Sequence, residues 1–211
     1  KTTCIVNLCS QLAAAGLVPI IFDYHGDIED QLTRHVPAIQ AVDIENGIGF
    51  NPLRVVGSSP TAWIDNIGMV RDIFASIFPD FGDIQCNEIR TALRESYDEL
   101  GYGLPGIPQS EQPIPPFHRF YEILKSRPKP NPGILARLDE LNDYRLFHCN
   151  SEQSSLLEST LPVVIRLHST KNAVMQNALA SFILFNIYQN MFLRGSQSHI
   201  SHAVIFDEAH R

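Results

Sequence analysis

Apolar residues at the front of the chain change from a helical period to an unbroken run. Residues 2–15 carry them every three or four positions, which predicts an amphipathic helix that ends at Gly16. Positions 18–22 are apolar throughout and lead into Asp23. Such a run is typical of a strand buried on both faces of a parallel sheet. A short helical segment and a strand at about 41–44 are predicted to follow.

The end of the chain repeats this pattern of strands and helices. Apolar runs predict strands at 162–167 and 203–207, and a helix over 171–193 lies between them. The apolar stripe of that helix contains Val174, Ala178, Phe182, Phe185 and Gln189. Strand, helix and strand in this order indicate a doubly wound α/β sheet.

The middle of the chain is predicted to be helical almost throughout. Its helical periods lie at about 63–78, 84–100, 117–126 and 134–147. Residues 101–116 hold five prolines, which predict an extended linker on the surface. We therefore interpret the middle as a helical insertion in an α/β core.

Length and composition agree with a globular protein divided in this way. The 211 residues are 44% hydrophobic and 18% charged, as expected of a chain that buries a core. The predicted parts are a first core segment at 1–56, a mainly helical insertion at 57–160 and a second core segment at 161–211.

Charge and cysteine usage narrow the partners and the compartment. A net charge of −7 argues against binding nucleic acid through bulk electrostatics. The main basic cluster is Arg119, Lys125, Arg127 and Lys129. It fits either a contact to a nucleic-acid backbone or, more simply, the charged face of an amphipathic helix. Four cysteines without a C-x-x-C pair, and no apolar stretch long enough to span a bilayer, favour a reducing, cytoplasmic location.

The two ends of the sequence carry the candidate chemistry. The last strand delivers Asp207 and Glu208 to the carboxyl edge of the sheet, which is the Walker B pattern of a P-loop NTPase. The sequence opens on Lys1, Thr2 and Thr3 at the start of a helix, which matches the end of a Walker A motif without its glycine-rich part. Each motif is weak alone, but their order and placement together predict a nucleotide site.

Each of these residues has a predicted role in binding ATP and Mg²⁺. Lys1 is expected to reach the β- and γ-phosphate oxygens, and Thr2 to ligate Mg²⁺ through its hydroxyl. Thr3 is expected to bind the α-phosphate at the helix start. Asp207 is expected to hold Mg²⁺ and Glu208 to polarise the attacking water, which makes Glu208 and Lys1 the candidate catalytic residues.

The residues between the motifs resemble one superfamily in particular. Asp23, His25, Gly26 and Asp27 match the element D-x-H-G-[DE] that ends the second strand in HerA-type ATPases, and an F-N-P-L element follows at 50–53. With K-T-T at the front and I-F-D-E-A-H at the back, nearly the whole chain resembles the HerA–FtsK superfamily of motor ATPases. The likeness is to its HerA branch and to the related conjugation-type ATPases.

This resemblance implies a fold, an activity and partners. The fold would be a RecA-like P-loop core, α/β with a parallel sheet and a helical insertion. The activity would be ATP hydrolysis that drives a hexameric DNA translocase or helicase, acting on double-stranded DNA with a nuclease or another effector. Asp23 and His25 would lie near the γ-phosphate or the attacking water. Alternatively, Asp23 caps the next helix and His25 packs in a turn.

Other functions fit the same motifs. A secretion or conjugation motor would use the same chemistry on a protein or DNA–protein cargo. A nucleotide-sensing scaffold would bind ATP without useful turnover, although the presence of Glu208 argues against it. The letters D-E-A-H at 207–210 also spell a helicase motif, but 206 positions separate Lys1 from Asp207. That spacing is about twice what DEAH-box helicases use.

The isolated 211 residues are predicted to bind ATP weakly and to hydrolyse almost none. The glycine-rich loop of Walker A would supply the backbone amides that cradle the phosphates, and this sequence lacks it. Equilibrium titration of the isolated chain with ATP and Mg²⁺ measures the affinity directly. Tight binding would contradict the prediction.

Overall fold

The chain forms two compact units, which the computed structural model describes over most of their length. The described residues are 1–43, 45, 47–104, 112–147 and 155–207. One unit comprises Lys1–Ile48 and Gln153–Arg211, and we call it the α/β unit. The other comprises Gly49–Glu152, and we call it the helical unit.

A parallel sheet forms the centre of the α/β unit. Its strands are β1 (Val18–Asp23), β2 (Gln40–Asp43), β3 (Val163–Arg166) and β4 (His202–Phe206). Among the described residues they lie in the order β2-β3-β1-β4, and every pair is parallel. The predicted α/β fold with a parallel sheet is confirmed.

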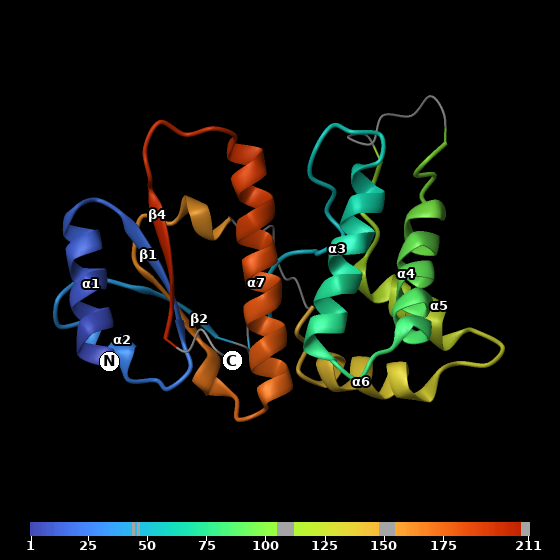
Figure 1. The fold of residues 1–211 in the computed structure, drawn as a ribbon, viewed down its shortest axis with the longest axis horizontal. Helices are drawn as coiled ribbons and strands as arrows, with labels where there is room; N and C mark the ends of the chain where they lie inside the picture. The colour runs from blue at the N-terminus through green and yellow to red at the C-terminus, as the bar shows by residue number, and fades with distance from the viewer. Residues whose placement is uncertain (44, 46, 105–111, 148–154, 208–211) are drawn as a thin grey trace. The chain divides into compact units, whose positions relative to one another are not determined.

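Helices cover both faces of this sheet. Figure 1 shows α1 (Thr2–Ala14) on one side and α7 (Ala173–Arg194) on the other. The short α2 (Ile28–Leu32) joins α1 on its side, and the 3₁₀ turns η3 (Leu156–Glu158) and η4 (Leu167–Ser169) flank β3 in the chain. The last helix begins at 173 because the Asn172 side chain accepts hydrogen bonds from the amides of Val174 and Met175.

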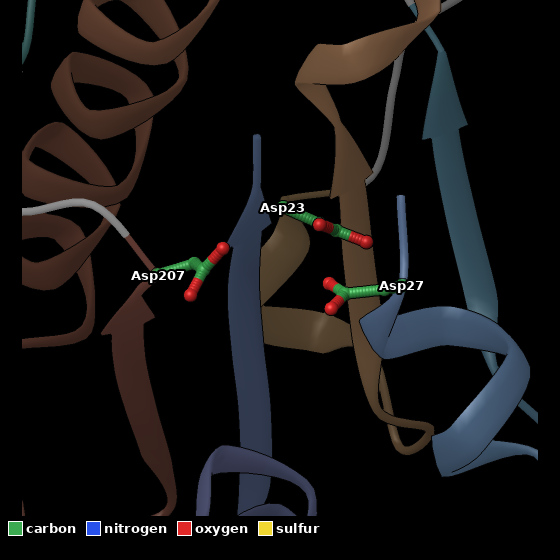
Figure 2. A group of neighbouring side chains, drawn as sticks. All are labelled: Asp23, Asp27 and Asp207. Atoms are coloured by element: carbon green, nitrogen blue, oxygen red, sulfur yellow. The ribbon is translucent and has the colours of Figure 1, made fainter. Parts of the chain in front are cut away.

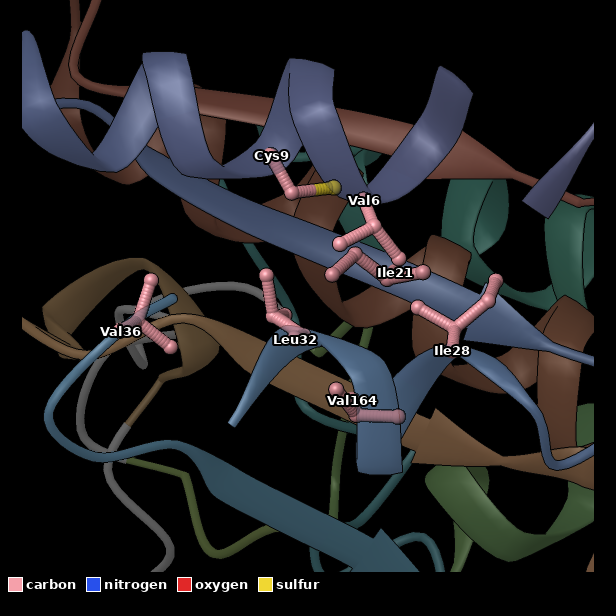
Figure 3. Close-up of a cluster of buried hydrophobic side chains, with 7 residues drawn as sticks. All are labelled: Val6, Cys9, Ile21, Ile28, Leu32, Val36 and Val164. Atoms are coloured by element: carbon pink, nitrogen blue, oxygen red, sulfur yellow. The ribbon is translucent and has the colours of Figure 1, made fainter. Parts of the chain in front are cut away.

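Strand β1 lies between two apolar layers, as its unbroken apolar run predicts. Ile21 belongs to a cluster formed with α1, α2 and β3 (Figure 3). The cluster contains Val6, Cys9, Ile21, Ile28, Leu32, Val36 and Val164. Because side chains alternate along a strand, Ile20 and Phe22 face the opposite layer, where the rings of Phe22 and Phe206 stack with centroids 4.5 Å apart. All three β1 residues are fully buried.

The helical unit is built from the four predicted helices. They are α3 (Ala62–Ile77), α4 (Asp83–Asp98), α5 (Phe117–Lys125) and α6 (Pro132–Asp143). Helix α6 starts earlier than its apolar pattern suggests, because the Asn131 side chain caps it and Pro132 fits the first helical position.

The proline-rich segment between α4 and α5 lies partly outside the described residues, since 105–111 are not among them. Its described ends pack against the unit. Tyr102 and Gln112 are both buried, and the Gln112 side chain donates a hydrogen bond to the Gly101 carbonyl at 2.8 Å. These two residues are therefore held in place, while Leu104 and Ile114 in the same ends are exposed, as in the surface linker that the prolines predict.

A buried polar network fixes the F-N-P-L element within the helical unit. The Tyr97 hydroxyl donates to the Leu53 carbonyl at 2.6 Å, and the Asn66 side chain donates to both the Pro52 carbonyl and the Tyr97 oxygen. The Asn51 side chain donates to the Pro115 carbonyl at 2.8 Å. The element thus ties the start of this unit to its helices.

None of the helices in the described part of the chain is long and apolar enough to cross a membrane.

The Tyr97→Phe substitution is expected to lower the free energy of unfolding by about 1–3 kcal/mol, because the buried Leu53 carbonyl loses its donor. Urea unfolding of the purified protein measures the change. Tyr144→Phe is the matched control, since Tyr144 is exposed, and it should be close to neutral. Equal stability of the two variants would argue against the network as an anchor.

Candidate functional site

Parallel pairing brings the carboxyl ends of β1 and β4 together. Phe22 lies beside Phe206 in the register, and the Asp207 amide donates to the Phe22 carbonyl at 3.3 Å. Asp23 and Asp207 therefore leave adjacent strands at the same edge of the sheet. Figure 2 shows both carboxylates there, together with Asp27 from the loop that follows β1.

Asp23 organises the loop between β1 and α2. Its side chain is fully buried, and it accepts hydrogen bonds from the backbone amides of His25, Gly26 and Ile28 at 3.1, 2.8 and 3.4 Å. The last of these amides belongs to the first residue of α2. These hydrogen bonds stabilise the buried carboxylate. They also give Asp23 the geometry of a helix cap, which was the alternative to a role near the γ-phosphate.

Gly26 allows this loop to turn sharply. Its φ is +83°, a left-handed conformation that residues with a Cβ adopt at a cost. A Cβ on Gly26 would also lie 2.9 Å from Cδ2 of His168, on the turn after β3. Two separate constraints therefore require glycine between His25 and Asp27.

Asp207 is buried and pairs with the start of the chain. Only 3% of the residue is exposed, and its Oδ1 lies 3.3 Å from Nζ of Lys1. Its Oδ2 is 3.8 Å from Nε2 of His25 and has no hydrogen-bond partner within the described residues. The structure thus brings Lys1, His25 and Asp207 together at this edge of the sheet.

Thr2 contacts a residue to which the sequence assigned no role. The Thr2 hydroxyl donates a hydrogen bond to Oδ2 of Asp27 at 2.6 Å, across 25 positions of the chain. Asp27 was visible in the sequence as the last residue of the D-x-H-G-[DE] match, but that match did not say what its side chain contacts.

The other two predicted site residues add less. Thr3 lies exposed in the first turn of α1, next to Thr2. Glu208, the predicted catalytic base, lies outside the described residues. Their roles stay predictions.

The three carboxylates have the chemistry of a site for a hard divalent cation. Asp23, Asp27 and Asp207 each offer one oxygen, and these oxygens lie within 4.8 Å of one another. Mg²⁺ prefers carboxylate and hydroxyl oxygens, and the Thr2 hydroxyl lies at the same place. The unpartnered Oδ2 of buried Asp207 fits this reading, because a buried carboxylate oxygen without a partner is costly unless a cation balances it.

An ion-pair group fixes α2 beside the site. Arg166, at the end of β3, forms ion pairs with Glu29 on α2 and with Asp43 at the end of β2. The hydrogen bond from Arg166 lowers the pKa of Glu29, so that Glu29 stays ionised to a lower pH than an ordinary glutamate. Because α2 starts directly after Asp27, this group also holds the loop that carries Asp27.

The comparison with solved structures decides the fold class. VirB4 of Thermoanaerobacter pseudethanolicus superposes on 99% of this chain with a TM-score of 0.68 and 21% sequence identity. This chain therefore shares the α/β fold of that VirB4 structure. The chain spans 57% of the length of that VirB4 chain. No family model matches the sequence, and no curated protein matches it.

The Gly26→Ala substitution is expected to destabilise the protein clearly more than Gly16→Ala. Both glycines have a positive φ, so both changes incur backbone strain of about 1–2 kcal/mol. Only the Gly26 variant adds a clash, since nothing lies within 4 Å of a Cβ on Gly16. Chemical unfolding of the two variants measures the difference. Equal losses would mean that the approach of His168 does not constrain the loop.

Proposed function

We propose that this chain is the ATP-hydrolysing core of a motor ATPase of the secretion or conjugation type. The observation that carries the proposal is the meeting of Lys1, Thr2 and Asp207 at the carboxyl edge of a parallel sheet. This edge is where open α/β sheets bind their ligands. The likeness to VirB4 over 99% of the chain supports the choice of motor, which the sequence left as an alternative.

Lys1 and the start of α1 would hold the phosphates. The first backbone amides of a helix lack intrahelical acceptors and attract anions, and α1 begins at Thr2. Lys1 Nζ is paired with Asp207, and 53% of the Lys1 side chain is exposed. The ammonium group can therefore turn toward a phosphate without creating a cavity in the protein interior. Phosphate then competes with Asp207 for the same ammonium group.

Thr2 and Asp207 would hold Mg²⁺, which neutralises charge on the phosphate oxygens when it is bound. The oxygen donors and the unpartnered Oδ2 of Asp207 fit that ion. Glu208 follows Asp207 directly and would orient and deprotonate the attacking water. His25, whose Nε2 faces Asp207 at 3.8 Å, would contribute to the charge balance around that carboxylate.

A HerA-type DNA translocase is the second candidate. The match of residues 23–27 to the HerA element favours it, and it would act as a hexameric ring on double-stranded DNA with a nuclease or other effector. The main basic cluster offers this candidate little support. Arg119 forms ion pairs with Glu99 and Glu122, and Arg127 with Glu95, so acidic neighbours neutralise two of its four charges.

The catalytic assignment is tested with two substitutions in the full-length gene product. Glu208→Gln should keep ATP binding and lower the ATPase rate by about 10²–10⁴-fold, because the water loses its base. Asp207→Asn should weaken the Mg²⁺-dependent part of ATP binding. The exposed Asp30→Asn, on α2, is the control and should leave both unchanged. Undiminished hydrolysis by Glu208→Gln would contradict the role assigned to Glu208. If the unmodified protein binds ATP but does not hydrolyse it, a nucleotide-sensing scaffold would be favoured.

The ATPase rate of the unmodified full-length gene product distinguishes the two proposed motors. A secretion or conjugation motor is expected to show a basal ATPase rate that double-stranded DNA changes little at physiological salt. Steady-state rates with and without DNA measure this. Strong stimulation by DNA would favour the translocase instead.

A further inference from the structure

The hydrogen bond between Thr2 and Asp27 sets the direction of the Thr2 hydroxyl. A hydroxyl carries one proton and two lone pairs, and in this structure the proton points at Oδ2 of Asp27 at 2.6 Å. Its lone pairs are then left for another partner. A carboxylate that accepts a hydrogen bond from the Thr2 hydroxyl also makes the Thr2 oxygen a better ligand for a cation. Groups that hydrogen-bond to a metal ligand generally have this effect.

Asp27 is the carboxylate of the cluster that is available for this role. Asp23 already accepts three backbone amides and is fully buried, so its position is fixed by the loop. Asp207 pairs with Lys1 through one oxygen and leaves the other without a hydrogen-bond partner among the described residues. Asp27 is exposed, and its carboxylate accepts the hydrogen bond from Thr2.

A second observation points to a cation at the same place. Oδ2 of Asp207 is buried and has no hydrogen-bond partner in the described part of the chain, while oxygens of Asp23, Asp27 and Asp207 lie within 4.8 Å of one another. Like charges this close repel unless a positive charge lies among them. The Lys1 ammonium supplies one such charge on the Oδ1 side, and on the Oδ2 side Nε2 of His25 lies 3.8 Å away, beyond hydrogen-bond distance.

We propose that Asp27 is a positioning residue for the metal site, which holds the Thr2 hydroxyl so that a lone pair of Thr2 faces the cation beside Asp207. This inference rests on the proposed nucleotide function. Asp27 is itself held in place from two directions along the sequence. The Gly26 turn precedes it, and α2, which Arg166 binds through its ion pair with Glu29, follows it. The geometry of the β1–α2 loop thereby controls how well Thr2 binds the metal.

The test measures metal dependence of nucleotide binding, without turnover. Fluorescence titration with ATP that carries an N-methylanthraniloyl group gives the affinity at a series of Mg²⁺ concentrations and in EDTA. In the full-length gene product, Asp27→Ala should raise the Mg²⁺ concentration for half-maximal binding by about tenfold. The affinity in EDTA should stay within about twofold, since Asp27 does not contact the phosphates in this proposal.

Conservative and paired variants make the test specific. Asp27→Asn keeps an acceptor for the Thr2 proton, so it should stay within about threefold of the unmodified protein in the Mg²⁺ titration. Thr2→Val should lose as much as Asp27→Ala, and adding Asp27→Ala to Thr2→Val should cost nothing further. Asp30→Ala, on the same short helix and exposed, should behave as the unmodified protein.

The outcomes separate this inference from the function on which it rests. Additive losses in the double variant, an Asp27→Asn variant as impaired as Asp27→Ala, or equal losses with Mg²⁺ and EDTA would overturn the role of Asp27. If Asp207→Asn weakens Mg²⁺-dependent binding while Asp27→Ala does not, only this inference fails. If the unmodified protein shows no Mg²⁺-dependent binding, the proposed function fails first.

Discussion

Three backbone amides of the loop after β1 converge on one buried carboxylate, that of Asp23. Burial of a charge is costly, and these hydrogen bonds make it tolerable only while the loop keeps one conformation. The loop in turn carries His25 and Asp27 toward Asp207 and Thr2. The candidate site therefore depends on Asp23, whose carboxylate oxygens already accept hydrogen bonds from the protein backbone.

Much of the α/β fold follows from local pattern, because the patterns there have simple physical causes. The unbroken apolar run at 18–22 predicts a strand covered on both faces, and β1 is such a strand. The contacts of Asp27 with Thr2 and of Asn51 with Pro115 could not be predicted in the same way. Each joins positions 25 or 64 residues apart, and no local preference of either residue specifies its partner.

The candidate site shows the same division. Lys1 and Asp207 were predicted from motifs whose chemistry is tied to residue type, and the structure places them 3.3 Å apart. The role of Gly26 is visible only once His168 is seen to approach it from the turn after β3. The F-N-P-L element had been part of a family likeness. Its contacts with Asn66 and Tyr97 now give it a structural explanation within the helical unit.

The ion pair between Lys1 and Asp207 has a thermodynamic consequence for any ligand of this site. An anion that takes Lys1 leaves Asp207 short of a counter-charge, and a cation that takes Asp207 frees Lys1 for an anion. Each ion thus removes the obstacle to the other, and by linkage the two affinities must rise together by the same factor. Because of this ion pair, this edge of the sheet should bind a metal–anion complex more tightly than it binds either ion alone.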